Sequence, residues 1–276
     1  MSVLDSVMSM LGDTDGKVAP HILVRRVPFD QPWEWLAAGW RDLWTYPGVS
    51  LTYGLVFAAG AVLMAIGTTQ AGAQSIILAL FGGFLLVGPL VAVGLYEVSR
   101  RIEAGEPVTL AAALKKSFQP EGQLGFMGVV LFLIFMVWMQ VAFLLFMLFT
   151  GGSALPPPSQ FVQMLFFTDH GLGLLIFGTL AGALLAFFTF SVSVVSVPLL
   201  MVRDVDVATA ISTSFHAVRR NPRPMLLWAA LIAGFVMMGI ATMCTGLVVV
   251  FPLIGHATWH AYKDLVEFTD GSATTT

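Results

Sequence analysis

Two histidines form the one pair in the sequence with the spacing of metal ligands. His256 and His260 stand four residues apart, so on a helix both imidazoles share one face and can reach the same ion. A metal site would need further ligands, and His216, Glu97 or Asp264 could supply one. The alternative is that both side chains hydrogen-bond to backbone groups and water near a helix end. Because neighbours on one helix face cannot occupy opposite sides of a porphyrin, the pair is poorly suited to haem, and we expect no cofactor.

Ionisable groups are scarce in the apolar runs of the chain. Glu97 precedes Arg100 and Arg101 by three and four residues, which predicts ion pairs along one helix with a structural role. Gln140 lies within a long apolar run and is expected to bond a neighbouring helix. Cys244 is interpreted as a small packing residue. We find no phosphate-binding glycine loop, nucleophile elbow, zinc-protease motif or basic nucleic-acid patch, and we therefore expect no catalytic residues and no nucleic-acid partner.

The elements that position these residues are long hydrophobic segments. Of the 276 residues, 57% are hydrophobic and 11% are charged, whereas a soluble domain carries about 25% charged residues. Six segments contain the roughly 20 apolar residues that a membrane-spanning helix needs. They lie at about 48–68, 74–98, 125–150, 172–201, 224–243 and 245–262. The sequence predicts an all-α membrane bundle of six spans, the last of which is the shortest and most polar.

Lysine and arginine residues lie on one side of these spans. All 13 precede span one, fall between spans two and three or between spans four and five, or follow span six. The opposite connections, near 69–73, 151–171 and Cys244, contain none. Since cytoplasmic loops carry the excess of basic residues, the cationic side is predicted to be cytoplasmic, with both ends of the chain on it.

A threefold internal repeat organises the predicted spans. Spans two, four and six each contain a proline followed by leucine, at Pro89, Pro198 and Pro252, where we expect packed kinks. An amphipathic segment precedes each odd-numbered span. We predict three parallel units of one interfacial helix and two spans, at about 30–101, 107–201 and 206–263. Together they form one membrane domain, 30–268, between a cytoplasmic segment, 1–29, and a cytoplasmic tail, 269–276.

The first amphipathic segment is rich in tryptophan. Its helical spacing predicts one apolar stripe, made of Trp33, Leu36, Ala37, Trp40, Leu43 and Trp44. Glu34, Arg41 and Asp42 are predicted on the opposite face. Because tryptophan favours the headgroup level, we expect Trp33, Trp40 and Trp44 to lie at the membrane interface. The alternative is that the amphipathic helices pack beneath the bundle as a cytoplasmic cap.

Several stretches of the sequence resemble one bacterial family. They are Val24–Arg26, Pro32–Leu36, Gly39–Trp44, Tyr46–Pro47, Gly88–Leu90, Gly94–Arg101 and Gly105–Pro107. These stretches resemble the integral-membrane proteins of domain-of-unknown-function family 2189, most strongly over about residues 24–120 and extending to about residue 268. The resemblance implies a multi-pass protein of the bacterial inner membrane and brings no known activity. Some members are labelled cytochrome c oxidase subunit I, but an oxidase core needs histidines on several helices, and this chain has His256 and His260 on one.

These features favour a non-catalytic accessory, assembly or scaffolding component of a membrane complex. The expected partners are the lipid bilayer and either another membrane protein or a second copy of the chain. One alternative is a small permease or channel for a neutral or apolar solute. Another is a metal- or haem-binding respiratory subunit that uses His256 and His260.

Overall fold

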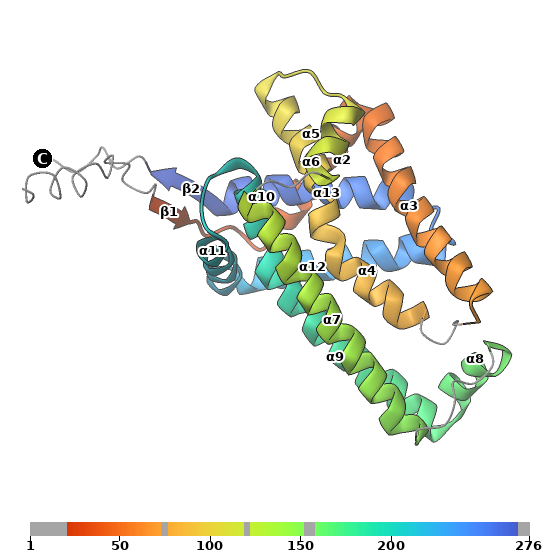
Figure 1. Cartoon of the computed structure of the whole chain (residues 1–276). Coiled ribbons are helices and arrows are strands. Elements are labelled where there is room, and N and C mark those ends of the chain that lie inside the picture. Colours follow the sequence, from red (N-terminus) through yellow and green to blue (C-terminus); the bar gives the residue numbers. More distant parts are fainter. Residues whose placement is uncertain (1–20, 73–76, 119–121, 152–157, 270–276) are drawn as a thin grey trace, which may run out of the picture.

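The computed structural model describes residues 21–72, 77–118, 122–151 and 158–269, and helices dominate it (Figure 1). Most of the predicted tail and most of the predicted N-terminal segment lie outside these residues. The first half contains β1 (His21–Val24), α2 (Gln31–Thr45), α3 (Pro47–Gln70), α4 (Ile77–Val91), α5 (Val93–Ala104), α6 (Leu110–Phe118) and α7 (Gly122–Thr150). The second half contains α8 (Pro158–Phe167), α9 (Asp169–Ser193), α10 (Ser196–Val202), α11 (Val207–Arg220), α12 (Pro222–Ala241), α13 (Leu247–Leu265) and β2 (Val266–Thr269).

Local sequence signals explain many of the helix ends. Proline opens α3 and α12, where its fixed φ suits a first helical turn and its missing N–H has no partner to lose. Asp206 caps α11 by accepting a hydrogen bond from the backbone N–H of Thr209 at 2.9 Å. Gly105 ends α5 in a left-handed conformation with φ of 65°, which glycine adopts without steric cost.

Within the described part of the chain, five helical stretches are long and apolar enough to cross a membrane. They are Pro47–Gln70, Ala79–Ala104, Gly122–Thr150, Asp169–Val202 and Pro222–Ala241. They correspond to the first five spans expected from the sequence. The segment expected as span six is α13, which is helical but is not among the five. Its second half carries four charged or imidazole groups, His256, His260, Lys263 and Asp264, and these lower its mean hydropathy.

Two of the five stretches are broken helices. The second stretch is interrupted at Ala92, between α4 and α5, and the fourth at Val194–Val195, between α9 and α10. Pro198 explains the break at Val194–Val195, because proline has no N–H to donate to the carbonyl four residues earlier, at Val194. Pro89, by contrast, precedes its break by three residues, and Pro252 lies within the continuous helix α13. The three prolines therefore occupy different places relative to the breaks.

Helix α13 forms the centre of the packed core. It runs antiparallel to α12 after a tight turn in which Met243 and Cys244 take left-handed conformations, and it contacts α2, α3 and α5 (Figure 1). A methyl group added to Gly39 of α2 would lie 2.6 Å from the backbone nitrogen of Ala257. The two backbones can approach this closely only because a glycine stands at the contact.

A short β-ladder joins the two ends of the described chain. Strands β1 and β2 pair antiparallel, with Val24 opposite Val266 and His21 opposite Thr269. Each strand has four residues, too few for a reliable alternating pattern, and the sequence analysis did not predict them. The ladder places the chain before α2 directly beside the chain after α13.

Candidate functional site

A buried polar cluster lies where α2, α3, α5 and α13 meet. At its centre His256 is fully buried. Its Nε2 atom lies 3.0 Å from the Oγ of Ser50 on α3, and its Nδ1 atom lies 2.8 Å from the Oγ of Ser99 on α5. Ser99 in turn donates a hydrogen bond of 2.6 Å to Oδ2 of Asp42 on α2. Four helices are thus connected through side-chain hydrogen bonds around one imidazole.

The direction of these hydrogen bonds follows from the chemistry of Asp42. An ionised carboxylate can only accept, so the single proton of the Ser99 hydroxyl is committed to Asp42. Ser99 must therefore accept from His256, which places a proton on Nδ1 of the ring. The Nε2 atom is then an acceptor, and Ser50 donates to it. His256 is a neutral imidazole with both nitrogens satisfied.

The cluster extends from the core toward the surface. His260, one turn after His256, lies with Nε2 2.8 Å from Oδ2 of Asp42. Its Nδ1 atom is 3.8 Å from Glu103, whose other carboxylate oxygen is 3.3 Å from the ammonium group of Lys263. Polar groups thus follow one another from a fully buried serine to an exposed lysine. A half-exposed pair such as Glu103 and Lys263 contributes at most about 1 kcal/mol.

Asp42 is the charged member that holds the cluster together. Burial raises the pKa of this carboxyl, but hydrogen bonds from His260 and Ser99 and the nearby imidazoles outweigh burial and leave the pKa below its usual value. The carboxylate is therefore ionised at neutral pH, as the hydrogen-bond directions require. The sequence analysis placed Asp42 on the outer face of its helix, and this was wrong, because the residue is only 8% exposed.

The face of α2 that packs inward also differs from the predicted stripe. Trp35, which the stripe omitted, is 1% exposed and donates from its indole nitrogen to Asp264 at 2.7 Å. Trp33, Trp40 and Trp44 lie on the outer side of α2, and each is about half exposed. The helix therefore has a buried face toward α13 and an adjacent tryptophan face that the protein leaves uncovered.

Geometry argues for a structural use of the serine–histidine pair. A serine that donates to a histidine is also the arrangement that activates a nucleophile. Ser50, Ser99 and His256 are all fully buried, however, and none of them lines either of the two surface hollows described below. A substrate approaching from those hollows does not reach the Ser50 hydroxyl. The cluster satisfies buried polar groups and fixes how four helices pack.

The other residues considered as metal ligands do not form a metal-binding group with the two histidines among the described residues. Asp264 accepts hydrogen bonds from Gln31 and Trp35, and His216 is exposed on α11. Within the described ranges, no three or more His, Cys, Asp or Glu side chains form a group that could hold a metal ion. Both ring nitrogens of His256 are already within hydrogen-bond distance of serine hydroxyls.

Glu97 takes part in an ion-pair network at the end of α5. Its carboxylate accepts hydrogen bonds from Arg100 at 2.8 Å and from Arg101 at 2.6 Å. These are the ion pairs expected from the spacing of three and four residues. Arg100 also reaches Glu106 at 2.8 Å, across the turn that follows α5. Glu97 is 6% exposed, so these contacts neutralise a buried carboxylate.

Comparison with known proteins bears on the membrane assignment. Residues 76–202, which include the broken helices α4–α5 and α9–α10, match the family described as "Predicted integral membrane protein (DUF2189)". The match covers somewhat less than half of the chain. The resemblance noted in the sequence is confirmed over these residues, whereas the tryptophan-rich stretch of α2 lies outside the match. No curated protein and no solved structure matches the chain.

Proposed function

We propose that this DUF2189 protein is a non-catalytic, six-span component of the bacterial inner membrane that acts by assembly, through association of two copies along α7. The observation that carries this proposal is Gln140, an exposed amide on the most apolar of the spans. The permease and respiratory-subunit alternatives stay predictions.

Parity supports six crossings rather than five. Strands β1 and β2 are hydrogen-bonded to each other, so the chain before the first span and the chain after α13 lie on one side of the membrane. An odd number of crossings would place them on opposite sides. The five apolar stretches therefore need a sixth crossing, and α13 follows the fifth directly through the turn at Met243 and Cys244. Its polar residues are accommodated because they bond to one another within the bundle.

The distribution of basic residues supports a cytoplasmic location for both ends. Arg25 on the described N-terminal side and Lys263 near the end of α13 lie on the side that carries every cation of the chain. That side includes the β-ladder, the ends of α5 and α13, and the interfacial helices α2, α6 and α11. Tryptophans exposed on α2 suit the headgroup level of the same leaflet.

Equivalent contacts support a repeat of three units. Gly39, Ala113 and Ala210 occupy corresponding places in α2, α6 and α11, and all three are buried. Gly39 touches Ala257 of α13, and the carbonyl oxygen of Ala113 lies 2.6 Å from where a methyl group on Gly94 of α5 would be. Gly94 and Ala257 each follow the proline of their span by five residues. The second spans of the first and third units are thus each contacted by an interfacial helix at the residue five positions after the proline.

The second and third interfacial helices share another contact, in which a serine hydroxyl binds a backbone N–H of the preceding span. Ser117 of α6 accepts from the backbone N–H of Gly94 at 2.7 Å, and Ser214 of α11 accepts from that of Val195 at 3.2 Å. Each serine follows the buried alanine of its helix by four residues and binds next to a helix break. Each interfacial helix would then pack on the broken or proline-containing span of the preceding unit, and α2 on α13 would close the ring.

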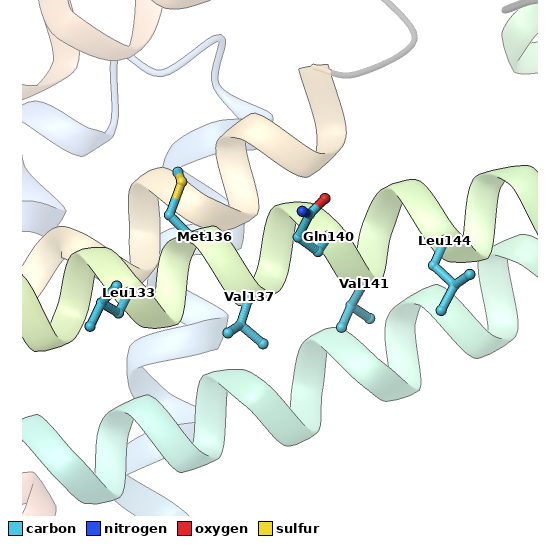
Figure 2. Close-up of a pocket in the computed structure, with 6 residues that line it drawn as sticks. All are labelled: Leu133, Met136, Val137, Gln140, Val141 and Leu144. Atoms are coloured by element: carbon cyan, nitrogen blue, oxygen red, sulfur yellow. The ribbon is translucent and has the colours of Figure 1, made fainter.

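Helix α7 presents an uncovered stripe to the bilayer. Only 6% of its most apolar window is buried within the protein. A shallow hollow of about 370 Å³ runs along it (Figure 2). Its lining is apolar apart from one amide, and consists of Leu133, Met136, Val137, Gln140, Val141 and Leu144. Gln140 has no hydrogen-bond partner among the described residues, and in hydrocarbon such an amide favours bonding across a helix interface.

A second copy of α7 is the partner that this amide fits best. A carboxamide carries donors and an acceptor, so two Gln140 side chains facing each other across a twofold axis can satisfy one another. Two copies inserted in the same orientation bring α7 beside α7 in parallel at the same depth. Leu133, Val137 and Leu144, at spacings of four and seven, then pack on either side of the amide pair.

Association in liposomes tests this proposal. Donor- and acceptor-labelled copies of the full chain would be reconstituted at decreasing protein density, and energy transfer would be measured. We expect Gln140→Leu to weaken association about three- to tenfold, the range of one interhelical hydrogen bond in a membrane. Gln140→Asn should retain most of it, and Thr179→Val, which removes an exposed hydroxyl from α9, should have no effect. A monomeric wild type, or equal transfer for Gln140→Leu, would overturn the proposal.

A further inference from the structure

A second hollow lies on the predicted cytoplasmic side, and Glu103 and Lys263, at the outer end of the histidine cluster, form part of its lining. It has a volume of about 760 Å³ and is bounded by the ends of α5, α10 and α13 and by β2. Two of the apolar stretches, Ala79–Ala104 and Asp169–Val202, end at its rim. Its walls combine aromatic side chains with cations, which distinguishes it from the apolar stripe on α7.

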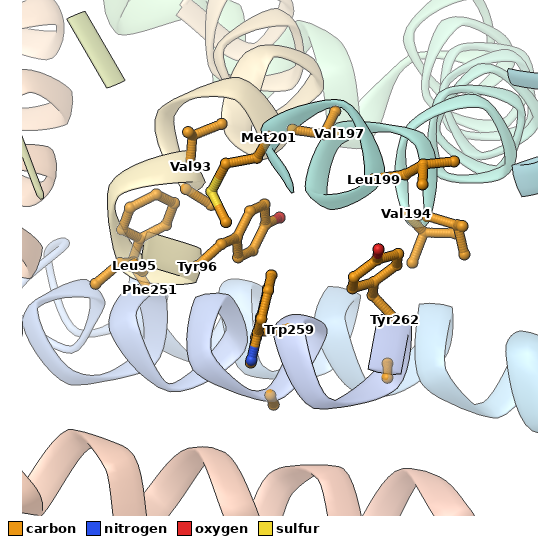
Figure 3. Close-up of a cluster of buried hydrophobic side chains, with 14 of the residues drawn as sticks. Val93, Leu95, Tyr96, Val194, Val197, Leu199, Met201, Phe251, Trp259 and Tyr262 are labelled. Atoms are coloured by element: carbon orange, nitrogen blue, oxygen red, sulfur yellow. The ribbon is translucent and has the colours of Figure 1, made fainter. Parts of the chain in front are cut away.

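One wall of the hollow contains a buried hydroxyl without a partner. Tyr262 of α13 is 2% exposed, and its Oη atom has no hydrogen-bond partner. Figure 3 shows this phenol pointing from α13 toward α10, beyond the neighbouring ring of Trp259. A buried donor left unsatisfied destabilises a protein by about 1–3 kcal/mol. A ligand that accepts a hydrogen bond from this hydroxyl would remove that penalty.

Arg203, which directly follows α10, lines the same hollow as Tyr262. Its guanidinium carbon lies 4.2 Å from the centre of the Phe268 ring of β2, a cation–π contact that leaves its N–H donors free to bind. Among the described residues Arg203 forms no ion pair, although it lines the hollow and is exposed. A cation and a neutral donor therefore face the same space from α10 and α13.

The remaining charges of the hollow are already engaged. Arg100 is held by two carboxylates, and Lys263 lies 3.3 Å from Glu103. Glu267 lies 3.9 Å from Arg25, which directly follows β1. Arg203 is thus the charge that lacks a counterpart, and the group missing from the hollow is an anion that can also accept from a phenol.

We propose that this hollow binds the phosphate group of an anionic membrane phospholipid, held by Arg203 and by the hydroxyl of Tyr262. Basic pockets between spans on the cytoplasmic side are suited to phospholipid headgroups. Aromatic residues such as Trp259 and Tyr262 suit the same depth. Val202 and Phe268 supply apolar surface where the glycerol backbone and first methylenes lie. A soluble phosphate ester has the same anionic group but lacks the apolar part.

Native mass spectrometry of the full chain, released from bilayers of phosphatidylcholine containing phosphatidylglycerol, tests the site. We expect the wild type to retain phosphatidylglycerol. Arg203→Gln should lower retention about fivefold, which corresponds to one basic residue near the membrane surface. Tyr262→Phe should lower it about tenfold, as expected for one hydrogen bond to a charged group. The control Arg219→Gln removes an exposed arginine of α11 that does not line the hollow and should leave retention unchanged.

A second readout separates binding from damage to the fold. In pure phosphatidylcholine, Tyr262→Phe should unfold at the same temperature as the wild type or at a higher one, because it removes an unsatisfied buried hydroxyl. Added phosphatidylglycerol should raise the unfolding temperature of the wild type more than that of the variant. Equal retention by all variants would overturn the proposal. So would displacement of the lipid by millimolar glycerol 3-phosphate, which would identify the ligand as a soluble phosphate ester.

Discussion

The Oγ of Ser50 on α3 lies 3.0 Å from the Nε2 of His256 on α13, and both residues are fully buried. This contact joins the first apolar span to the last helix of the chain, 206 residues away. Through Ser99 and Asp42 the same imidazole also joins α5 and α2. One polar side chain therefore links the first unit of the chain to α13, in addition to the packing of α13 on α2, α3 and α5.

Removal of this imidazole should destabilise the whole bundle. His256→Ala leaves the hydroxyl of Ser50 without its acceptor and that of Ser99 without its donor, and it opens a cavity between α3, α5 and α13. We expect a loss of about 3–4 kcal/mol from two unsatisfied groups and the lost packing. That loss lowers the unfolding temperature by about 5–10 °C. The measurement is thermal unfolding of the full chain in mild detergent, followed by the fraction that stays monodisperse.

His216→Ala is the matched control for this change. His216 is exposed on α11, so the same substitution should leave the unfolding temperature within about 1 °C of the wild type. Equal unfolding temperatures for the two variants would show that the imidazole of His256 does not fix the helix packing.

Two glycines of α3 should respond in opposite ways to alanine. A methyl group on Gly54 would meet the carbonyl oxygen of Val248 and the ring of Pro252, and neither backbone can move away cheaply. Gly60, on the same helix, has no atom within 4 Å of the added methyl. We expect Gly54→Ala to destabilise by about 1–3 kcal/mol, and Gly60→Ala to be neutral or to stabilise by up to about 1 kcal/mol. Thermal unfolding of both variants, measured side by side, decides the matter; the same response from both would contradict the close approach of α3 and α13.

The helical membrane character could be predicted from sequence because hydropathy is a local property. Each of the five apolar stretches contains its own signal within about 20 residues. The expected boundaries agree to within three residues for four of the stretches, whereas the span expected at 74–98 is found at Ala79–Ala104. The break at Val194–Val195 follows from Pro198, whereas nothing local indicates the break at Ala92. There, Ser117 and Tyr53 from other helices bind the carbonyl oxygen of Val91, so tertiary contacts stabilise the interruption.

The polar cluster could not be predicted because its members are far apart in the sequence. His256 was singled out, but its partners Ser50 and Ser99 are 206 and 157 residues away. The face of α2 was misassigned for a different reason. Two overlapping stripes fit its helical period, one through Trp33 and Trp40 and one through Trp35, and hydrophobicity alone does not choose between them. Only the packing of α13 selects the second.

Acid should weaken the cluster through Asp42. Because hydrogen bonds hold its pKa below the usual value, the carboxylate contributes stability above its unfolded pKa of about 3.9. That contribution disappears as the pH falls through the lower pKa of the folded state. Asp42→Asn should therefore be less stable than the wild type at pH 7, and the difference should shrink below about pH 4. The unfolding temperatures of both proteins would be measured between pH 7 and pH 3. The titration of other carboxylates cancels in the difference between the two temperatures. A difference that stays constant with pH would contradict this role of Asp42.

Both ends of the described chain should be reached from one side of the membrane. In a Cys244→Ser background, single cysteines would be placed at Arg25→Cys, directly after β1, and at Glu267→Cys on β2, where the native side chains are 3.9 Å apart. Gln70→Cys and Gln163→Cys are exposed at the end of α3 and on α8, on the opposite side of a six-span protein. A membrane-impermeant maleimide added to intact cells should label the second pair, and the first pair only after lysis. Labelling of Glu267→Cys but not Arg25→Cys in intact cells would mean that α13 does not cross, and that β1 and β2 do not pair in the membrane.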